Sequence, residues 1–244
     1  DTNTDTDTDT DTDTDTDTDT DTDGGDTDSG GGIDSGGGDT GEEIACAATS
    51  ALTEGPFYLA TGDVRQDITE GLPGAPFTVR LVLVDAATCE PLVGVAVDLW
   101  QASPRGNYSG VDNAILVEGA PNTAGETFMR GRQVTDAEGV VTFESVYPGW
   151  YPVSAPHIHM TAAITEDASF TWQFILDDDY SEMIYTTVAP YTDRGTHPVR
   201  ASDLPGLPTD LIVVPQGSAD ATSLDLVVAI DLTSLSDPPR EYGD

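Results

Sequence analysis

The stretch FTVRLVLVD at residues 77–85 sets the fold class of this chain. Apolar side chains occupy every second position, and β-branched and aromatic residues are frequent, which is the pattern of a strand with one buried face. Six further stretches have the same character, and turn signals such as EPLVG, DAEG and LPGLP separate several of them. They are VAVDLWQA (95–102), GVVTFESV (139–146), PHIHMTAAI (156–164), FTWQFILD (170–177), DLIVV (210–214) and SLDLVVAIDL (223–232).

Several short strands without long helical repeats between them favour an all-β fold. We therefore expect an antiparallel β-sandwich or barrel, in which long loops such as residues 103–127 carry function or form a pocket. A single short helix is predicted around SEMIYTTV (181–188).

The N-terminal segment, residues 1–43, has a different composition. It carries 17 acidic residues and no basic one, and Ile33 is the one apolar side chain among residues 1–41. Such a stretch cannot bury enough surface to offset its ordering entropy, so we expect a disordered, acidic, Asp/Thr-rich tether. An ion-binding or adhesive segment is the alternative. Residues 44–244 then form one domain with its own core.

The charge of the chain limits its partners. There are 45 acidic residues against eight basic ones, all arginine, and the formal net charge is −37. A chain this acidic repels nucleic acids and anionic membrane surfaces, and we expect neither as a partner. No run of about 18 apolar residues is present, so no membrane-spanning segment is expected.

Three features predict an exported protein. The sequence begins at Asp1 without Met, as it would after removal of a leader. A tether followed by one folded domain suits an extracellular or surface-tethered protein, for example a lipoprotein. Cys46 and Cys89 are compatible with one disulfide in an oxidising compartment, with two separate buried thiols as the alternative. We predict that the two cysteines are joined.

Two of the three histidines stand close together in YPGWYPVSAPHIHM (147–160). On a strand, His157 and His159 point to the same face, about 6.5 to 7 Å apart, so both imidazoles can reach one ion. Tyr151, after the YPG turn, and Tyr108, in the Gly-flanked RGNYSG loop, are candidate phenolate ligands. Imidazole and phenolate together favour a hard, high-valent cation.

Five segments, taken in order, resemble the intradiol ring-cleavage dioxygenases over roughly residues 46–200. They are TEGPFY, RQDITEGLPGAP, DAATCEPLVGVAVDLWQASPRGNYSG, FMRGRQVTDAEGVVTFESVYPGWY and PHIHM. DLWQA is similar to the protocatechuate 3,4-dioxygenase branch, whereas TEGPFY, TC and YSG look more like its exported relatives.

The resemblance implies non-haem Fe(III) held by Tyr108, Tyr151, His157 and His159 on a β-sandwich. It further implies that a catechol binds the iron, that Tyr151 leaves the metal and takes a catechol proton, and that O2 opens the ring between the two hydroxylated carbons. The product is then a muconate-type diacid. Gln173 matches a glutamine near the iron in that family.

The resemblance also points to substrate-binding residues. Gly55, Pro56 and Tyr58 in GPFY correspond to the segment that lines the substrate mouth. The family commonly carries Arg three residues before the first histidine, and here that position is Ser154. Arg130, which we take as a substrate-binding candidate, or Arg132 could supply the missing positive charge; the alternative is that both are surface residues of a strand in FMRGRQ.

Two readings of other classes compete with this one. The sandwich could be a cell-surface binding module whose His-X-His pair is vestigial or holds zinc. A zinc or copper hydrolase or oxidase would need a further ligand, and the remaining histidine, His197, stands alone in RGTHPV.

Because residues 1–41 offer nothing that could pack, deleting them is expected to leave the melting temperature and the iron content of the protein unchanged. Calorimetry and metal analysis of the truncated and full-length chains measure both. A clear loss of thermal stability on truncation would contradict the tether interpretation.

Overall fold

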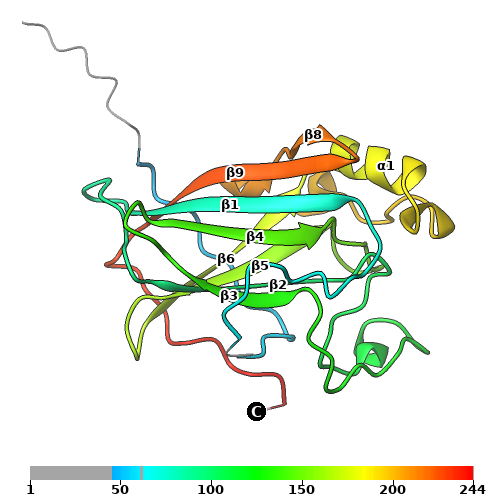
Figure 1. The fold of residues 1–244 in the computed structure, drawn as a ribbon, viewed down its shortest axis with the longest axis horizontal. Helices are drawn as coiled ribbons and strands as arrows, with labels where there is room; N and C mark the ends of the chain where they lie inside the picture. The colour runs from blue at the N-terminus through cyan, green and yellow to red at the C-terminus, as the bar shows by residue number, and fades with distance from the viewer. Residues whose placement is uncertain (1–45, 61–62, 244) are drawn as a thin grey trace, which may run out of the picture. The chain divides into compact units, whose positions relative to one another are not determined.

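The computed structural model describes residues 46–60 and 63–243. Their strands form two sheets that face each other across one apolar core (Figure 1). The first sheet has the order β4-β1-β9-β8 and consists of β1 (Pro76–Asp85), β4 (Val140–Val146), β8 (Gln216–Ser218) and β9 (Ala221–Ile230). The second has the order β3-β2-β5-β6-β7 and consists of β2 (Ala96–Gln101), β3 (Arg130–Val134), β5 (His157–Ala163), β6 (Ser169–Leu176) and β7 (Ile212–Val213).

The predicted all-β sandwich is confirmed, but both sheets are mixed rather than purely antiparallel. β1 pairs antiparallel with β4 and parallel with β9, and β6 pairs parallel with β7. The remaining pairings are antiparallel. β9 and β7 join their neighbours after long excursions of the chain. Tertiary packing therefore sets these two parallel pairings, whereas a tight turn joins β9 to β8.

Each predicted strand stretch overlaps an observed strand, whereas β3 and β8 lay outside the predictions. The predicted helix is α1 (Asp178–Thr187), which lies beside β8 at one end of the sandwich (Figure 1). It begins before the predicted position because the Asp177 side chain accepts a hydrogen bond from the Tyr180 amide and caps the first turn. Short 3-10 turns occur at Asn113–Ile115, Tyr191–Asp193, Ala201–Asp203 and Thr209–Leu211.

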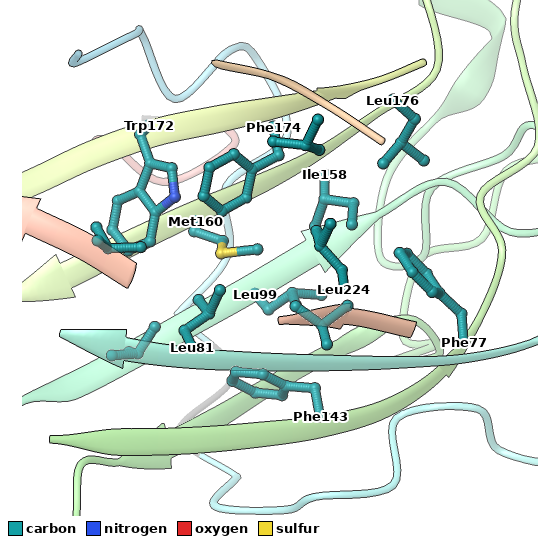
Figure 2. Packing of buried hydrophobic residues seen from close by; sticks show 14 of the residues in the cluster. Phe77, Leu81, Leu99, Phe143, Ile158, Met160, Trp172, Phe174, Leu176 and Leu224 are labelled. Atoms are coloured by element: carbon teal, nitrogen blue, oxygen red, sulfur yellow. The ribbon is translucent and has the colours of Figure 1, made fainter. Parts of the chain in front are cut away.

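The core lies between the sheets and follows from the alternation of each strand (Figure 2). In β1, Phe77, Val79, Leu81 and Leu83 are buried, while the residues between them are more exposed over most of the strand. From the second sheet, Leu99, Ile158, Met160, Trp172, Phe174 and Leu176 point into the same space. Burying this apolar surface supplies the main driving force for folding.

The same alternation turns the opposite face of β5 away from the core. Ile158 and Met160 enter the core between the sheets, so His157 and His159 lie on the outer face of the second sheet. That face is nevertheless buried, because a second apolar cluster covers it. The cluster consists of Phe57, Tyr58, Trp100, Ala102, Tyr108, Val111 and Tyr151. Loops thus enclose the histidines on a face that is usually exposed.

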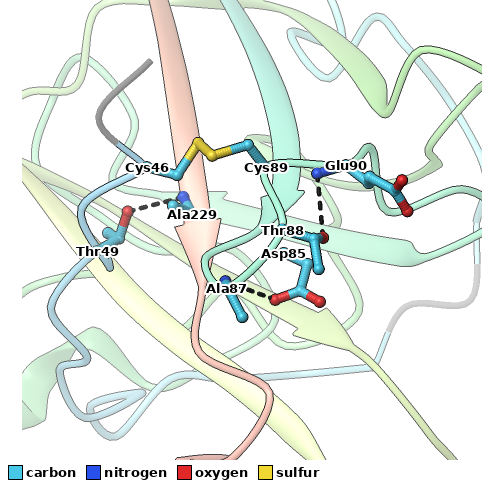
Figure 3. Close-up of a disulfide and its surroundings, with 8 residues drawn as sticks. All are labelled: Cys46, Thr49, Asp85, Ala87, Thr88, Cys89, Glu90 and Ala229. Carbon is cyan, nitrogen blue, oxygen red and sulfur yellow. Dashed lines mark hydrogen bonds between the residues drawn. A yellow bond between two sulfur atoms is a disulfide. The ribbon is translucent and has the colours of Figure 1, made fainter. Parts of the chain in front are cut away.

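The predicted disulfide joins Cys46 to Cys89, with 5.7 Å between the two Cα atoms (Figure 3). It links the start of the described chain, at Cys46, to the turn after β1. Nearby, the Thr49 amide donates to the carbonyl of Ala229 in β9, and the Thr49 hydroxyl accepts from the Ala229 amide. Together these contacts fasten the start of the described chain to the first sheet.

The predicted tether, residues 1–43, lies outside the described residues. In the part of the chain that the structure describes, no helix is both long enough and apolar enough to cross a membrane.

The Cys46–Cys89 bridge closes a loop with a sequence separation of 43 residues. The chain-entropy model gives such a loop about 4 kcal/mol of stabilisation, because cross-linking restricts the unfolded chain. We expect the Cys46→Ser, Cys89→Ser and double variants to lose about 3 to 4 kcal/mol of unfolding free energy in urea titrations.

The three variants should lose the same amount, because either substitution removes the whole bridge. Finding two titratable thiols in the unfolded, non-reduced wild-type protein would reject the disulfide.

Candidate metal centre

Four side chains that the sequence singled out converge on the outer face of β5. The Nε2 atoms of His157 and His159 lie 2.9 Å apart. The Tyr108 hydroxyl is 3.3 Å from Nε2 of His157 and 3.2 Å from Nε2 of His159. The Tyr151 hydroxyl is 3.1 Å from Nε2 of His157 and 3.5 Å from the Tyr108 hydroxyl. Two imidazole nitrogens and two phenol oxygens therefore surround one point.

Tyr108 is held by hydrogen bonds within the long loop between β2 and β3. The Asn113 side chain accepts from the Tyr108 amide at 2.7 Å and donates to the Tyr108 carbonyl at 2.8 Å. The Thr123 hydroxyl donates to the same carbonyl at 2.7 Å. Asn113 and Thr123 are buried, and the sequence analysis missed both because nothing in their local pattern marks them.

Tyr151 follows β4 after a close approach between two backbone segments. The Gly149 amide donates to the Ser103 carbonyl, and a Cβ at Gly149 would lie 2.2 Å from the Pro104 carbonyl oxygen. Glycine is therefore required at this position of the PGW motif. Tyr151 then pairs with Ser154 in an isolated β-bridge, which turns the chain back toward β5.

The tautomer of His157 follows from its contacts. Its Nδ1 atom lies 2.6 Å from the carbonyl oxygen of Ala155, which can only accept, so Nδ1 carries the proton. Nε2 therefore presents a lone pair to the cluster, and three neighbouring groups crowd around that one acceptor. This is the tautomer in which imidazole binds a metal, with the other ring nitrogen donating to a carbonyl.

His159 is oriented mainly by packing. The indole of Trp100 stacks on its imidazole, with ring centroids 5.0 Å apart and planes 5° from parallel. Its Nδ1 atom is buried and has no hydrogen-bond partner within the described residues. Gly55 lies over the ring in a left-handed conformation, with φ at +68°, and a Cβ there would lie 3.1 Å from Cε1 of His159.

The four donors fit a metal ion. Ligands held about 2.0 to 2.1 Å from one ion lie about 3 to 3.5 Å from one another, as these four atoms do. In the described part of the chain, no group of three or more His, Cys, Asp and Glu side chains is arranged to hold a metal. The two phenols therefore complete this donor set, and hard anionic oxygens of this kind favour a hard cation.

Burial keeps all four groups neutral when no cation is present. It raises the pKa of Tyr108 well above its usual value, and the neighbouring Tyr151 raises it further. Burial likewise raises the pKa of Tyr151. For the imidazoles, burial lowers the pKa of His157. Burial lowers the pKa of His159 further, and so does repulsion from Arg130 and from His157 whenever His157 is protonated. Neutral imidazole is the form that binds a metal.

The predicted neighbours of the centre lie close to it but make their own protein contacts. Gln173 is paired with His159 across β5 and β6, and its amide donates to the Thr53 carbonyl at 2.7 Å. Pro56 is exposed, whereas Tyr58 is buried and its hydroxyl donates to Asp98 at 2.8 Å. Of the GPFY residues predicted to bind substrate, Gly55 lies against a donor residue, His159.

The two arginines considered for the missing charge are both committed to the protein. Arg132 makes a two-point ion pair with Asp98, at 2.6 and 2.7 Å. Arg130 is 2% exposed and donates to oxygens of Ser109 and Phe57. At the predicted arginine position, the Ser154 hydroxyl lies 3.3 Å from Nδ1 of His157.

Comparisons with known proteins bear on this site. A family model described as Dioxygenase matches residues 53–173, which include all four donors. The solved structure of an intradiol ring-cleavage dioxygenase from Tetranychus urticae is 28% identical, with a TM-score of 0.66, over 76% of this chain and 95% of that one.

Chlorocatechol 1,2-dioxygenase of Pseudomonas putida is 27% identical over 124 residues, which is 49% of this chain and 43% of that enzyme. The chain thus matches less than half the length of this curated relative. The solved structure of chlorocatechol 1,2-dioxygenase from Pseudomonas putida, at 18% identity and a TM-score of 0.53, shows a shared fold.

The lowered pKa values of His157 and His159 predict a pH dependence of stability. Below the ordinary histidine pKa of 6.5, the unfolded chain binds protons that the folded metal-free protein does not. The free energy of unfolding of the metal-free protein is therefore highest above about pH 7. It decreases as the pH falls below about 6.5, by up to about 1.4 kcal/mol per pH unit for each histidine.

Urea unfolding of the metal-free protein between about pH 7.5 and 5.5 measures this slope. The His157→Gln/His159→Gln variant is the control, because it keeps His197 and the carboxylates common to both proteins. Its slope should be flatter, and equal slopes would show that the two imidazoles are not held neutral.

Proposed function

The chain belongs to the intradiol ring-cleavage dioxygenase family, and from this we propose that it opens the ring of a catechol-type diol between its two hydroxylated carbons with O2. The product would be a muconate-type diacid. We propose Fe(III), on which this family generally depends, as the cofactor, held by Tyr108, Tyr151, His157 and His159. The single observation that carries the proposal is the convergence of these four donor atoms within 3.5 Å of their neighbours.

When bound, Fe(III) would supply the Lewis acid that holds the two diol oxygens and prepares the ring for reaction with O2. The chain's own residues supply the ligand charge. Tyr108 and Tyr151, as phenolates, would add two negative charges, which stabilise the ferric over the ferrous state. His157 and His159 would bind as neutral imidazoles, each kept in place by a different support. For His157 the support is the Ala155 carbonyl, and for His159 it is the stacked Trp100 ring.

The exposure of the four residues supports Tyr151 as the group that gives way to the diol. Tyr151 is 8% exposed, compared with 4% for each histidine and 0% for Tyr108. Val153, two residues further on, is 64% exposed. A diol would approach from this side, where the Tyr151 phenolate would accept one of its protons. The burial of the remaining donors would exclude water from the reacting ring.

Gly55 lets a further part of the chain approach the centre. Because it has no side chain, the segment of residues 53–58, which we call the cover segment, can lie directly over His159. A side chain at this position would press on that ring, because its Cβ would lie 3.1 Å from Cε1 of His159. The amide of Gln173 fastens the start of the cover segment by donating to the Thr53 carbonyl.

We propose in addition that the protein is exported and acts outside the cell or tethered to its surface. The Cys46–Cys89 disulfide supports this, because such bonds persist in oxidising compartments. The acidic composition of residues 1–43 suits a solvated tether. Detection of the protein in the culture medium or on intact cells of its source organism tests the proposal, and retention in the cytoplasm would contradict it.

Two phenolates bound to Fe(III) give a ligand-to-metal charge-transfer band, so the purified ferric protein is expected to be red to burgundy. Tyr108→Phe and Tyr151→Phe each remove one phenolate and should shift or bleach the band. His157→Ala and His159→Ala should mainly lower the iron content. Visible absorption spectra and metal analysis of the five proteins measure both effects.

Adding a catechol without O2 should change the spectrum, and admitting O2 should reverse that change while a ring-opened diacid appears. A colourless protein that takes up no iron on reconstitution would contradict the dioxygenase function. A coloured protein whose spectrum ignores every catechol would instead favour a metal-containing binding module.

A further inference from the structure

Arg130 is a buried arginine beside the proposed centre whose hydrogen bonds reach two separate walls of the site. It stands at the first position of β3 and is 2% exposed. Its Nε atom donates to the Ser109 hydroxyl at 2.9 Å, and its Nη2 atom donates to the Ser109 carbonyl at 2.8 Å. Its Nη1 atom donates to the Phe57 carbonyl at 2.7 Å. The guanidinium thus bonds two parts of the chain at the same time. One is the stretch of Tyr108 and Ser109, which we call the Tyr108 wall, and the other is Phe57 of the cover segment.

Both walls carry a group that the proposed reaction needs. Ser109 adjoins Tyr108, and the Phe57 ring packs on the Tyr108 ring with centroids 4.9 Å apart. Phe57 also lies two residues after Gly55, which rests on His159. A shift of either wall would therefore move Tyr108 relative to the histidines or move Gly55 relative to His159.

The acceptors of Arg130 are unusual for a buried cation. Within the described residues it forms no ion pair with a carboxylate, and the partners of its guanidinium are neutral oxygens. Arg132, two residues along the same strand, is paired with Asp98. Burial lowers the pKa of Arg130 to about 10, so the group is still protonated at neutral pH. Its guanidinium carbon also lies 6.0 Å from the centroid of the Tyr108 ring. The fork of donors lets this one desolvated group bond oxygens of both Ser109 and Phe57.

The backbone aims Arg130 at these acceptors. Met129, immediately before it, is fully buried and has a φ of +55°, which is a strained conformation for a non-glycine residue. Its amide donates to the Ile68 carbonyl, and its carbonyl accepts from the Gln101 amide. The Arg130 carbonyl accepts from Nε of Arg65 at 2.9 Å. The strain at Met129 is thus retained by surrounding bonds that place the next side chain in the interior.

We propose that Arg130 is a positioning residue that fixes the position of the Tyr108 wall relative to the cover segment. It is then not the substrate ligand that the sequence suggested. This inference rests on the proposed function. It assigns Arg130 a role that acts through Tyr108 and Gly55, without contact to the diol.

Visible spectra of the iron-loaded protein test the proposal without relying on turnover. Arg130→Met should shift the charge-transfer band in the wild-type and in the Tyr151→Phe background, because both retain Tyr108 and the substitution releases the Tyr108 wall. Arg130→Lys should behave like Arg130→Met, since a single ammonium cannot reach oxygens of both walls. Adding Arg130→Met to Tyr108→Phe should change the band no further than Tyr108→Phe alone. Leu81→Ala, a truncation in the core of the opposite sheet, is the stability control and should leave the band in place.

Hydrogen exchange of the metal-free protein tests the same point independently of iron. The amides of Tyr108 and Gly110 are bonded to Asn113 and Thr123 within the loop. In Arg130→Met and Arg130→Lys they should exchange at least about tenfold faster than in Leu81→Ala, as expected when hydrogen bonds from a charged donor are lost.

Each outcome decides for or against the proposal. Full rescue of the band and of exchange protection by Arg130→Lys would show that only the charge matters and would overturn it. Additive spectral effects of Arg130→Met and Tyr108→Phe would do the same. If the wild-type protein binds no iron, the proposed function fails, while the exchange rates still show whether Arg130 holds the Tyr108 wall.

Discussion

The structure depends on the two-residue alternation of β5. Ile158 and Met160 are part of the core that holds the two sheets together, so His157 and His159 must face the other way. A shift of register by one residue would exchange the two sets and bury imidazoles in the core. The same packing that stabilises the sandwich therefore fixes the direction of both candidate ligands, and it does so without any contact to a metal.

Facing outward does not by itself make a metal centre, because an exposed pair of histidines would be surrounded by water. Here the second apolar cluster covers the outer face, and the Trp100 ring lies flat against His159. The same cluster contains Tyr108 and Tyr151 and brings them to the two imidazoles. Low polarity around four convergent donors strengthens their interaction with a cation and weakens competition from water.

Most residues of this second apolar cluster lie in irregular backbone. Buried hydrogen bonds, in place of regular secondary structure, hold them in position. Asn113 accepts a hydrogen bond from the Tyr108 amide, and Thr123 donates one to the Tyr108 carbonyl. Arg130 joins Ser109 to Phe57. Buried polar networks of this kind specify one arrangement when every member is satisfied. Left-handed Met129 and the desolvated guanidinium of Arg130 are locally unfavourable, and such features concentrate where a fold serves a site.

The amino-acid sequence by itself determined the fold class and most of the strands, and it singled out the four side chains that converge in the candidate centre. Period-two patterns such as that of residues 77–85 carry the strand signal, and the short-range motifs around Tyr108 and His157 carry the ligand signal. Only the tertiary structure decided the parallel pairing of β9 with β1, the burial of Arg130 and the commitment of the Tyr58 hydroxyl to Asp98. These features join residues far apart in the chain, and their energies come from packing and hydrogen bonds that no local pattern encodes.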